Sequence, residues 1–115
     1  MKTTKADFEE FKKWFLYYQD LFGLKNFDVT FLHKKVNGIY ASCDVQGDTT
    51  AVVMLNNQTS KDDIGVPPMK ELARHEAAHL LLGRLKKMAC TRFMNPDEID
   101  REEERVVTIL EKVIP

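Results

Sequence analysis

The sequence has little of several features that would restrict the class of protein. Its 115 residues include two cysteines, four prolines and five glycines. Cys43 and Cys90 are far apart in the chain, so neither a disulfide framework nor a C-x-x-C metal clip is present. No apolar run approaches the roughly 18 residues that a membrane-spanning helix needs. The first residues also lack the apolar core of a signal peptide, and we therefore expect a cytoplasmic protein that does not enter a membrane.

An excess of charge of either sign is also absent. Lysine and arginine number 17, aspartate and glutamate 18, and the formal net charge is −1. This balance gives no electrostatic argument for a nucleic-acid partner. One local basic cluster is expected to be solvated surface at a helix end and in a loop: Arg84, Lys86, Lys87 and Arg92. With 43% apolar and 30% charged residues, the chain is expected to fold as one globular domain over residues 1–115.

The first part of the chain predicts a helix with an aromatic core face. Aromatic side chains recur at helical spacing over residues 6–22, and Gly23 follows as a stop signal. This stripe indicates core packing rather than a cofactor or base-stacking platform, and it consists of Phe8, Phe11, Phe15, Tyr18 and Phe22.

Three strands are predicted next, over residues 27–31, 39–45 and 50–55. The dipeptide Asn37-Gly38 is preferred in two-residue hairpin turns, so the first two strands are expected to form a hairpin. A polar loop follows and leads to a helix from Met69 to about Gly83. A last helix is expected from Asn95-Pro96, a capping residue followed by a first-turn proline, to about Val113. The predicted order α-β-β-β-α-α, with a mainly antiparallel sheet, belongs to the α+β class.

The most informative stretch is His75-Glu76-Ala77-Ala78-His79, which reads H-E-x-x-H. Residues four apart lie on the same face of a helix, so two imidazoles can reach one metal ion. The glutamate between them is placed to act on a metal-activated water rather than to bind the metal. The motif therefore predicts a zinc site in which His75 and His79 are ligands and Glu76 is the general base.

The surrounding residues favour this interpretation over a chance match. Strong helix formers surround the motif, Pro67 and Pro68 suit the start of the helix, and apolar residues occupy almost every side of it. A helix that is apolar all round is expected in the core. Two histidines and a glutamate in such a helix are costly unless they are satisfied, and zinc ligation would satisfy the histidines.

A catalytic zinc site usually has three protein ligands and a water. Candidates for the third ligand are His33, Cys43, Cys90 and the acidic run of the last helix. In that run, Glu103 falls on the arc set by Val106, Val107 and Leu110, so it is predicted to point into the core. By the same helical geometry Glu102 lies at the border of this face and Glu104 on the solvent side. The alternative explanations for Glu103 in this apolar arc are that it is a partner for Arg74 or that the helix is tilted.

H-E-x-x-H followed by a glutamate ligand on a later helix is the gluzincin pattern. With its small size, its element order and its acidic last helix, the chain resembles the minigluzincins. These are small single-domain zincins, many from prokaryotes or prophages, and they are related to the SprT-like proteins. The resemblance implies a minimal zincin-like fold, zinc ligation by His75, His79 and Glu103, and Glu76 as catalytic base. It also implies that the third strand is the edge strand along which an extended peptide could bind.

The chemistry implied is zinc-dependent hydrolysis of a peptide bond in a peptide or protein substrate. Zinc lowers the pKa of its water, and Glu76 takes the proton and passes it to the leaving amine. Tyr40 and His33 are residue types that could stabilise the oxyanion, but neither is assigned this role. The alternative is a zinc-binding module of weak or no activity that acts through a protein partner. Analogy with SprT-like proteins also suggests a nucleic-acid-associated peptidase, which the balanced charge does not support.

Overall fold

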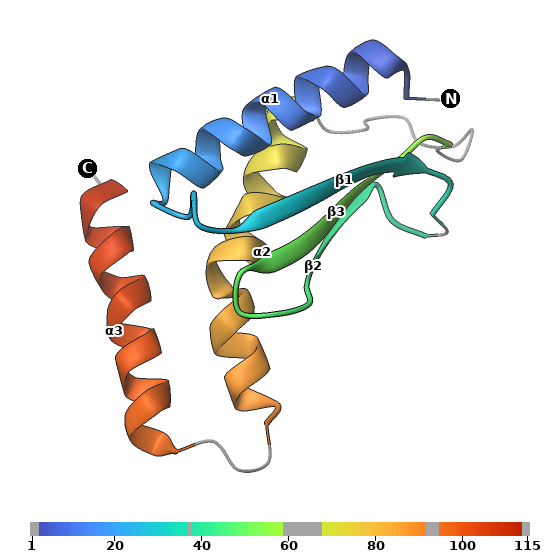
Figure 1. The fold of residues 1–115 in the computed structure, drawn as a ribbon. Coiled ribbons are helices and arrows are strands. Elements are labelled where there is room, and N and C mark those ends of the chain that lie inside the picture. Colours follow the sequence, from blue (N-terminus) through green and yellow to red (C-terminus); the bar gives the residue numbers. More distant parts are fainter. Residues whose placement is uncertain (1–2, 37, 59–67, 92–94, 114–115) are drawn as a thin grey trace.

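The computed structural model describes residues 3–36, 38–58, 68–91 and 95–113. In these residues, three helices and a three-stranded sheet follow one another in the order α1 (Lys5–Leu21), β1 (Asp28–Lys34), β2 (Ala41–Val45), β3 (Thr50–Asn56), α2 (Met69–Ala89) and α3 (Pro96–Val113). The helix α2 runs behind the sheet, and α3 returns alongside α2 on the side away from the strands (Figure 1). The predicted α+β class and element order are confirmed.

The aromatic stripe of α1 forms the centre of the core, as the spacing predicts. Phe11 and Phe15 are fully buried and Tyr18 is nearly so, while Phe8 and Phe22 pack at the margin. The helix begins after Thr4, whose hydroxyl accepts a hydrogen bond from the Asp7 amide while the Asp7 carboxylate accepts one from the Thr4 amide. This reciprocal capping box satisfies two amides at the start of the helix.

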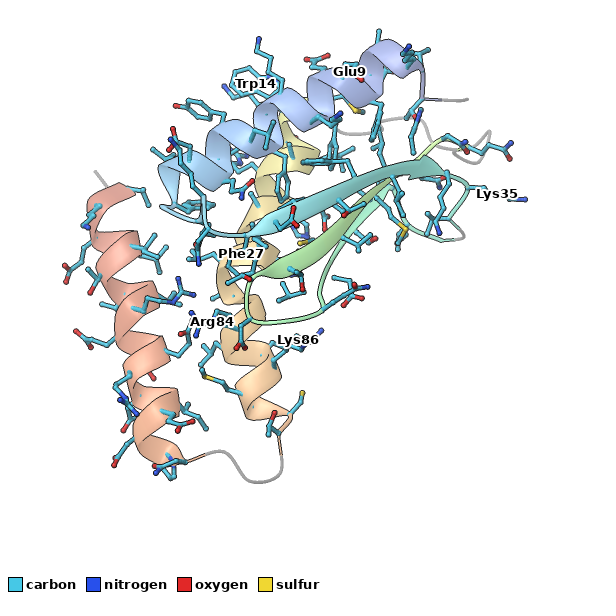
Figure 2. All side chains as sticks on the ribbon, viewed as in Figure 1. Glu9, Trp14, Phe27, Lys35, Arg84 and Lys86 are labelled. Carbon is cyan, nitrogen blue, oxygen red and sulfur yellow. The ribbon has the colours of Figure 1, made fainter. Side chains whose placement is uncertain are left out.

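Trp14 lies on the flank of the aromatic stripe, where it helps to join α1 to α2. Its ring lies on the outer side of α1 (Figure 2). The ammonium groups of Lys13 and Lys70 lie 5.4 and 4.6 Å from the ring centroid. Because Lys70 belongs to the first turn of α2, this cation–π contact crosses between the two helices.

The sheet is mixed, with the strand order β1-β3-β2. The strand β1 pairs with β3 in parallel, and β2 pairs with β3 antiparallel. The predicted hairpin between the first two strands is therefore wrong, although Gly38 does adopt the positive φ of 79° that a tight turn favours. The reason is burial: β3 carries three buried side chains in alternation, Ala51, Val53 and Leu55, so the most apolar strand takes the central position.

The buried side chain of Asn56 organises the connection from β1 to β2. Its amide nitrogen donates to the carbonyls of Val36 and Ile39, at 2.7 and 2.9 Å. Its amide oxygen accepts from the backbone N–H groups of Val36 and Gln58. All its hydrogen-bonding groups are thus engaged, as burial requires. None of the helices in the described part of the chain is long and apolar enough to cross a membrane.

The helix α2 continues six residues beyond the predicted end at Gly83, because this glycine serves a packing contact and not a helix stop. A β-carbon at Gly83 would lie 2.2 Å from Cγ2 and 2.8 Å from Cβ of Val45. The absence of a side chain therefore lets α2 approach β2 closely. Further along, the Lys87 ammonium donates to the Gln46 carbonyl at 2.5 Å, which ties the end of the helix to the β2–β3 turn.

We expect Gly83→Ala to destabilise the protein by about 1–3 kcal/mol, since the added methyl group meets Val45. This loss should exceed the gain of about 1 kcal/mol that alanine normally brings to a helix. Urea unfolding measures the change. In a Val45→Ala background the same substitution should cost clearly less, because the 2.2 Å contact with Cγ2 is removed and only the 2.8 Å contact with Cβ remains. A Gly83→Ala protein more stable than its parent would contradict this account of the contact.

Candidate metal centre

The H-E-x-x-H residues differ in burial. Glu76 is buried, with 5% of its surface exposed, whereas His75 and His79 are both exposed. The expectation of a helix buried on every side is therefore wrong, because Leu82 on the histidine side is 45% exposed as well. The histidines consequently need no metal to offset burial, and any metal that they bind would be accessible from solvent.

The two imidazoles are oriented toward one another. Their Nε2 atoms are 3.2 Å apart, and the rings meet edge to face with centroids separated by 4.8 Å. Two nitrogen ligands of one tetrahedral zinc ion, each bound at about 2.05 Å, stand roughly 3.3 Å apart. The spacing of the Nε2 atoms thus fits a shared zinc ion. It also fits a hydrogen bond between two neutral rings.

Glu76 points toward the sheet rather than to solvent. Burial raises the pKa of its carboxyl group above the usual value, and the neighbouring His79 and His75 partly oppose this increase. A carboxylate with a raised pKa is a stronger base than an ordinary one, which suits a general base. The neighbouring strand residue is Cys43, whose thiol has its pKa raised to about 12 by burial and by the charges of Glu76 and Asp44. Cys43 is therefore a protonated thiol at neutral pH.

The edge strand beside this site is β2, and the expectation that the third strand forms the edge is wrong. Two hydrogen bonds show which residues of β2 have backbone groups that face β3. Gln46 N–H donates to the Thr50 carbonyl, and Asn56 N–H donates to the Tyr40 carbonyl. In an antiparallel ladder only alternate residues face the partner strand. The backbone groups of Ala41, Cys43 and Val45 therefore point to the free edge, which no other strand of the described residues occupies.

The glutamates of α3 are oriented differently from the prediction. Glu102 is buried, with 5% exposure, while Glu103 and Glu104 are exposed. The prediction that Glu103 points into the core is wrong, because Val107 and Leu110, which were used to define the buried face, are 39% and 37% exposed. The helix is rotated by about one residue, so its inner face is centred on Val106 and Glu102, four positions apart.

The Glu102 carboxylate is held by Arg105. The Arg105 guanidinium donates from Nε to Oε1 of Glu102 at 2.6 Å and also forms an ion pair with it through Nη2. The same Nη2 donates to the Leu81 carbonyl of α2 at 3.2 Å. Arg105 thus links α3 to the turn of α2 that follows His79, and it holds Glu102 on the side of α3 that faces α2.

The other candidate ligands do not join the histidines. His33 lies on β1, where it stacks on Phe8 with ring centroids 4.8 Å apart and bonds to the Thr3 hydroxyl. Cys90 is exposed just after α2. Within residues 3–36, 38–58, 68–91 and 95–113, no three His, Cys, Asp or Glu side chains are close enough together to hold a metal ion. The motif therefore supplies two candidate ligands in this arrangement.

The basic residues are dispersed in the described structure. Arg84 and Lys86 project from the second half of α2 (Figure 2), and Lys87 contacts the β2–β3 turn. Arg92 lies outside the described residues. Comparisons with known proteins give no further guidance: no family model matches the chain, and searches of curated proteins and of solved structures found no match.

The raised pKa of Glu76 predicts a pH dependence of stability in the zinc-free protein. When folded, the carboxyl group binds its proton more tightly than when unfolded, so protonation favours the folded state. This contribution is lost as pH rises from the ordinary carboxyl pKa through the higher folded value. Glutamine has no carboxyl proton to lose. The stability of Glu76→Gln should therefore rise relative to that of the parent as pH increases across this window.

Urea unfolding between about pH 4 and 8, with a chelator present, measures the difference in the free energy of unfolding. Glu71→Gln is the matched control, because Glu71 is exposed on the same helix. Its stability should follow that of the parent at every pH. Parallel curves for the parent and Glu76→Gln would refute the pKa assignment.

Proposed function

We propose that this protein is a zinc-dependent peptidase of the gluzincin type, with His75 and His79 as metal ligands and Glu76 as catalytic base. The observation that carries the proposal is the 3.2 Å separation of the two Nε2 atoms, with a buried carboxyl group on the residue after the first histidine. Bound zinc would supply a Lewis acid that lowers the pKa of a water molecule and polarises a carbonyl group.

The role of Glu76 follows from its surroundings. Its carboxyl group is buried between α2 and β2, and burial raises its pKa, so its carboxylate is a stronger proton acceptor than an exposed one. The two imidazoles project from the exposed face, which leaves them accessible to a metal ion and to a substrate. The proposed chemistry is hydrolysis of an amide bond.

The free edge of β2 supports an extended peptide as the substrate. The backbone N–H and C=O groups of Ala41, Cys43 and Val45 point away from β3. A peptide that adds to this edge would form main-chain hydrogen bonds that do not depend on its sequence. The proximity of Cys43 to Glu76 would bring the peptide backbone beside the proposed base.

We propose Glu102, in place of Glu103, as the carboxylate of α3 that joins the histidines when zinc binds. Glu102 is buried and linked through Arg105 to α2, whereas Glu103 faces solvent. Binding would require the Glu102–Arg105 ion pair to open. A carboxylate that exchanges an arginine for a metal ion keeps its negative charge compensated throughout.

We expect one zinc ion per chain, and His75→Ala and His79→Ala should each lower zinc affinity by at least about a hundredfold, since each removes a metal ligand. Glu102→Gln should weaken zinc binding by about tenfold or more. Competition with a chromophoric chelator measures these affinities.

Glu103→Gln and Glu104→Gln are matched controls on the same helix and should bind zinc as the parent does. If Glu103→Gln has the largest effect among the three, the original assignment of the third ligand is right and the rotation of α3 changes on binding. Equal affinities in the parent and both histidine variants would refute the metal centre.

We also expect Glu76→Gln to retain zinc while hydrolysis of unstructured peptides falls by about a hundredfold or more, because the amide cannot take up the proton. The measurement is the initial rate of peptide cleavage at equal zinc occupancy. Glu71→Gln should cleave at the parental rate. A Glu76→Gln protein as active as the parent would remove this residue from the mechanism.

A zinc-binding module that acts through a protein partner is the second candidate. The observation in its favour is that the described residues bring only two metal ligands together, and that Glu102 is engaged by Arg105. A metal would then mainly stabilise the fold. Under this hypothesis zinc raises the melting temperature of Glu76→Gln and of the parent equally, and neither protein cleaves any peptide.

A further inference from the structure

The second edge of the sheet, formed by β1, has backbone groups that are free to pair. Asp28 N–H donates to the Thr49 carbonyl and Asn57 N–H donates to the Lys34 carbonyl, so Asp28 and Lys34 both face β3. Because successive residues of a strand direct their backbone groups to opposite sides, the N–H and C=O groups of Val29, Phe31 and His33 face away from β3. Within the described residues no strand pairs with this edge.

This edge lacks several of the features that usually prevent edge-to-edge pairing, namely bulges, proline and inward-pointing charges. Its charged side chains, Asp28 and Lys34, lie at the two ends of the strand. The strand β1 has seven residues with regular pairing throughout and contains neither proline nor glycine. The opposite edge strand, β2, is shorter, with five residues. An exposed regular strand of this kind favours association with another extended strand.

A groove of mixed polarity lies beside this edge, between β1 and the exposed flank of α1. It has a volume of about 700 Å³, and polar and charged residues such as Lys13 and Asp20 line it together with the apolar side chains of Leu16, Tyr17, Phe27, Val29 and Phe31. Leu16 and Tyr17 are 50% and 53% exposed, so this flank of α1 offers apolar surface to a partner. Phe27 lies where the chain enters β1 (Figure 2). The groove can accept apolar side chains from a partner whose backbone pairs with the strand.

The charges of β1 identify the partner. If a second copy of β1 runs antiparallel with Phe31 opposite Phe31, then Asp28 of each copy lies opposite Lys34 of the other. Both residues are exposed and lie on the same face of the sheet, because they are six positions apart. Opposite charges in directly paired positions stabilise strand pairing, while like charges there oppose it. The sequence of this edge is thus complementary to itself in one register.

We propose that the protein forms a two-fold symmetric dimer through antiparallel pairing of β1 with β1 of a second copy, centred on Phe31. The outward groups of Val29, Phe31 and His33 would form the ladder, with Val29 of one copy paired with His33 of the other. The exposed flanks of the two α1 helices would approach each other over the new pair of strands. An interface in which the same surface is used by both copies closes on itself and does not lead to fibres.

The proposed dimer does not depend on the proposed peptidase function. The strand order places β3 between β1 and β2, so the dimer edge and the edge near Glu76 lie on opposite sides of the sheet. The histidine pair and β2 would remain free in both copies. Loss of dimerisation and loss of zinc binding can therefore be measured separately.

Sedimentation equilibrium of the full chain, over concentrations up to about 1 mM, tests the proposal. The parent should approach a mass twice that of the 13.3 kDa chain. Asp28→Lys and Lys34→Asp should each weaken self-association by about tenfold or more, because each places two like-charged pairs in the interface. Both residues are exposed, so circular dichroism and unfolding should match those of the parent.

The decisive sample is an equimolar mixture of the two single variants. In the proposed register, the introduced lysine of one chain lies opposite the introduced aspartate of the other, and the remaining natural pair is also of opposite charge. The mixture should therefore dimerise as strongly as the parent, and so should the double variant Asp28→Lys/Lys34→Asp. A parent that stays monomeric throughout, single variants that dimerise like the parent, or a mixture that fails to recover would each overturn the proposal.

Discussion

The close approach of α2 to β2 is the contact on which the candidate site depends. Gly83 lies so near Val45 that the position has no room for a side chain. Glu76 precedes Gly83 by seven residues, which is two helical turns, so both lie on the same face of α2. Cys43 precedes Val45 by two residues and shares its face of the strand. The close contact of Gly83 with Val45 therefore also brings Glu76 near Cys43. The resulting burial of Glu76 raises the pKa of its carboxyl group.

The different burial of the motif residues separates their proposed chemical roles. Glu76 is buried toward the strand, while the two histidines are exposed and their Nε2 atoms are 3.2 Å apart. A proton-accepting group is thus held in a place of low polarity while two potential metal ligands stay accessible. Under the proposed function, each position suits its role: burial tunes the base, and exposure leaves the histidines open to a metal ion and a substrate.

The central position of β3 leaves two different edges. The strand β2 lies against the motif helix, and its outward backbone groups would serve the proposed peptide substrate. The strand β1 lies on the opposite side and carries the self-complementary pair Asp28 and Lys34. Separation of the two edges by β3 means that neither proposed interaction would obstruct the other. A hairpin of the first two strands would have paired one edge of each and changed which strands remain free.

The sequence alone determined the features that depend on neighbouring residues. Helical periodicity identified the aromatic core face of α1, and the i, i+4 spacing placed His75 and His79 on the same face of α2. Strand order, the end of α2 and the orientation of α3 were decided only by tertiary structure. β3 became central because it buries the most side chains, Gly83 continued the helix because it packs on Val45, and Glu102 turned inward because Arg105 anchors it to α2. Each of these outcomes rests on contacts between segments distant in the chain, which local patterns do not encode.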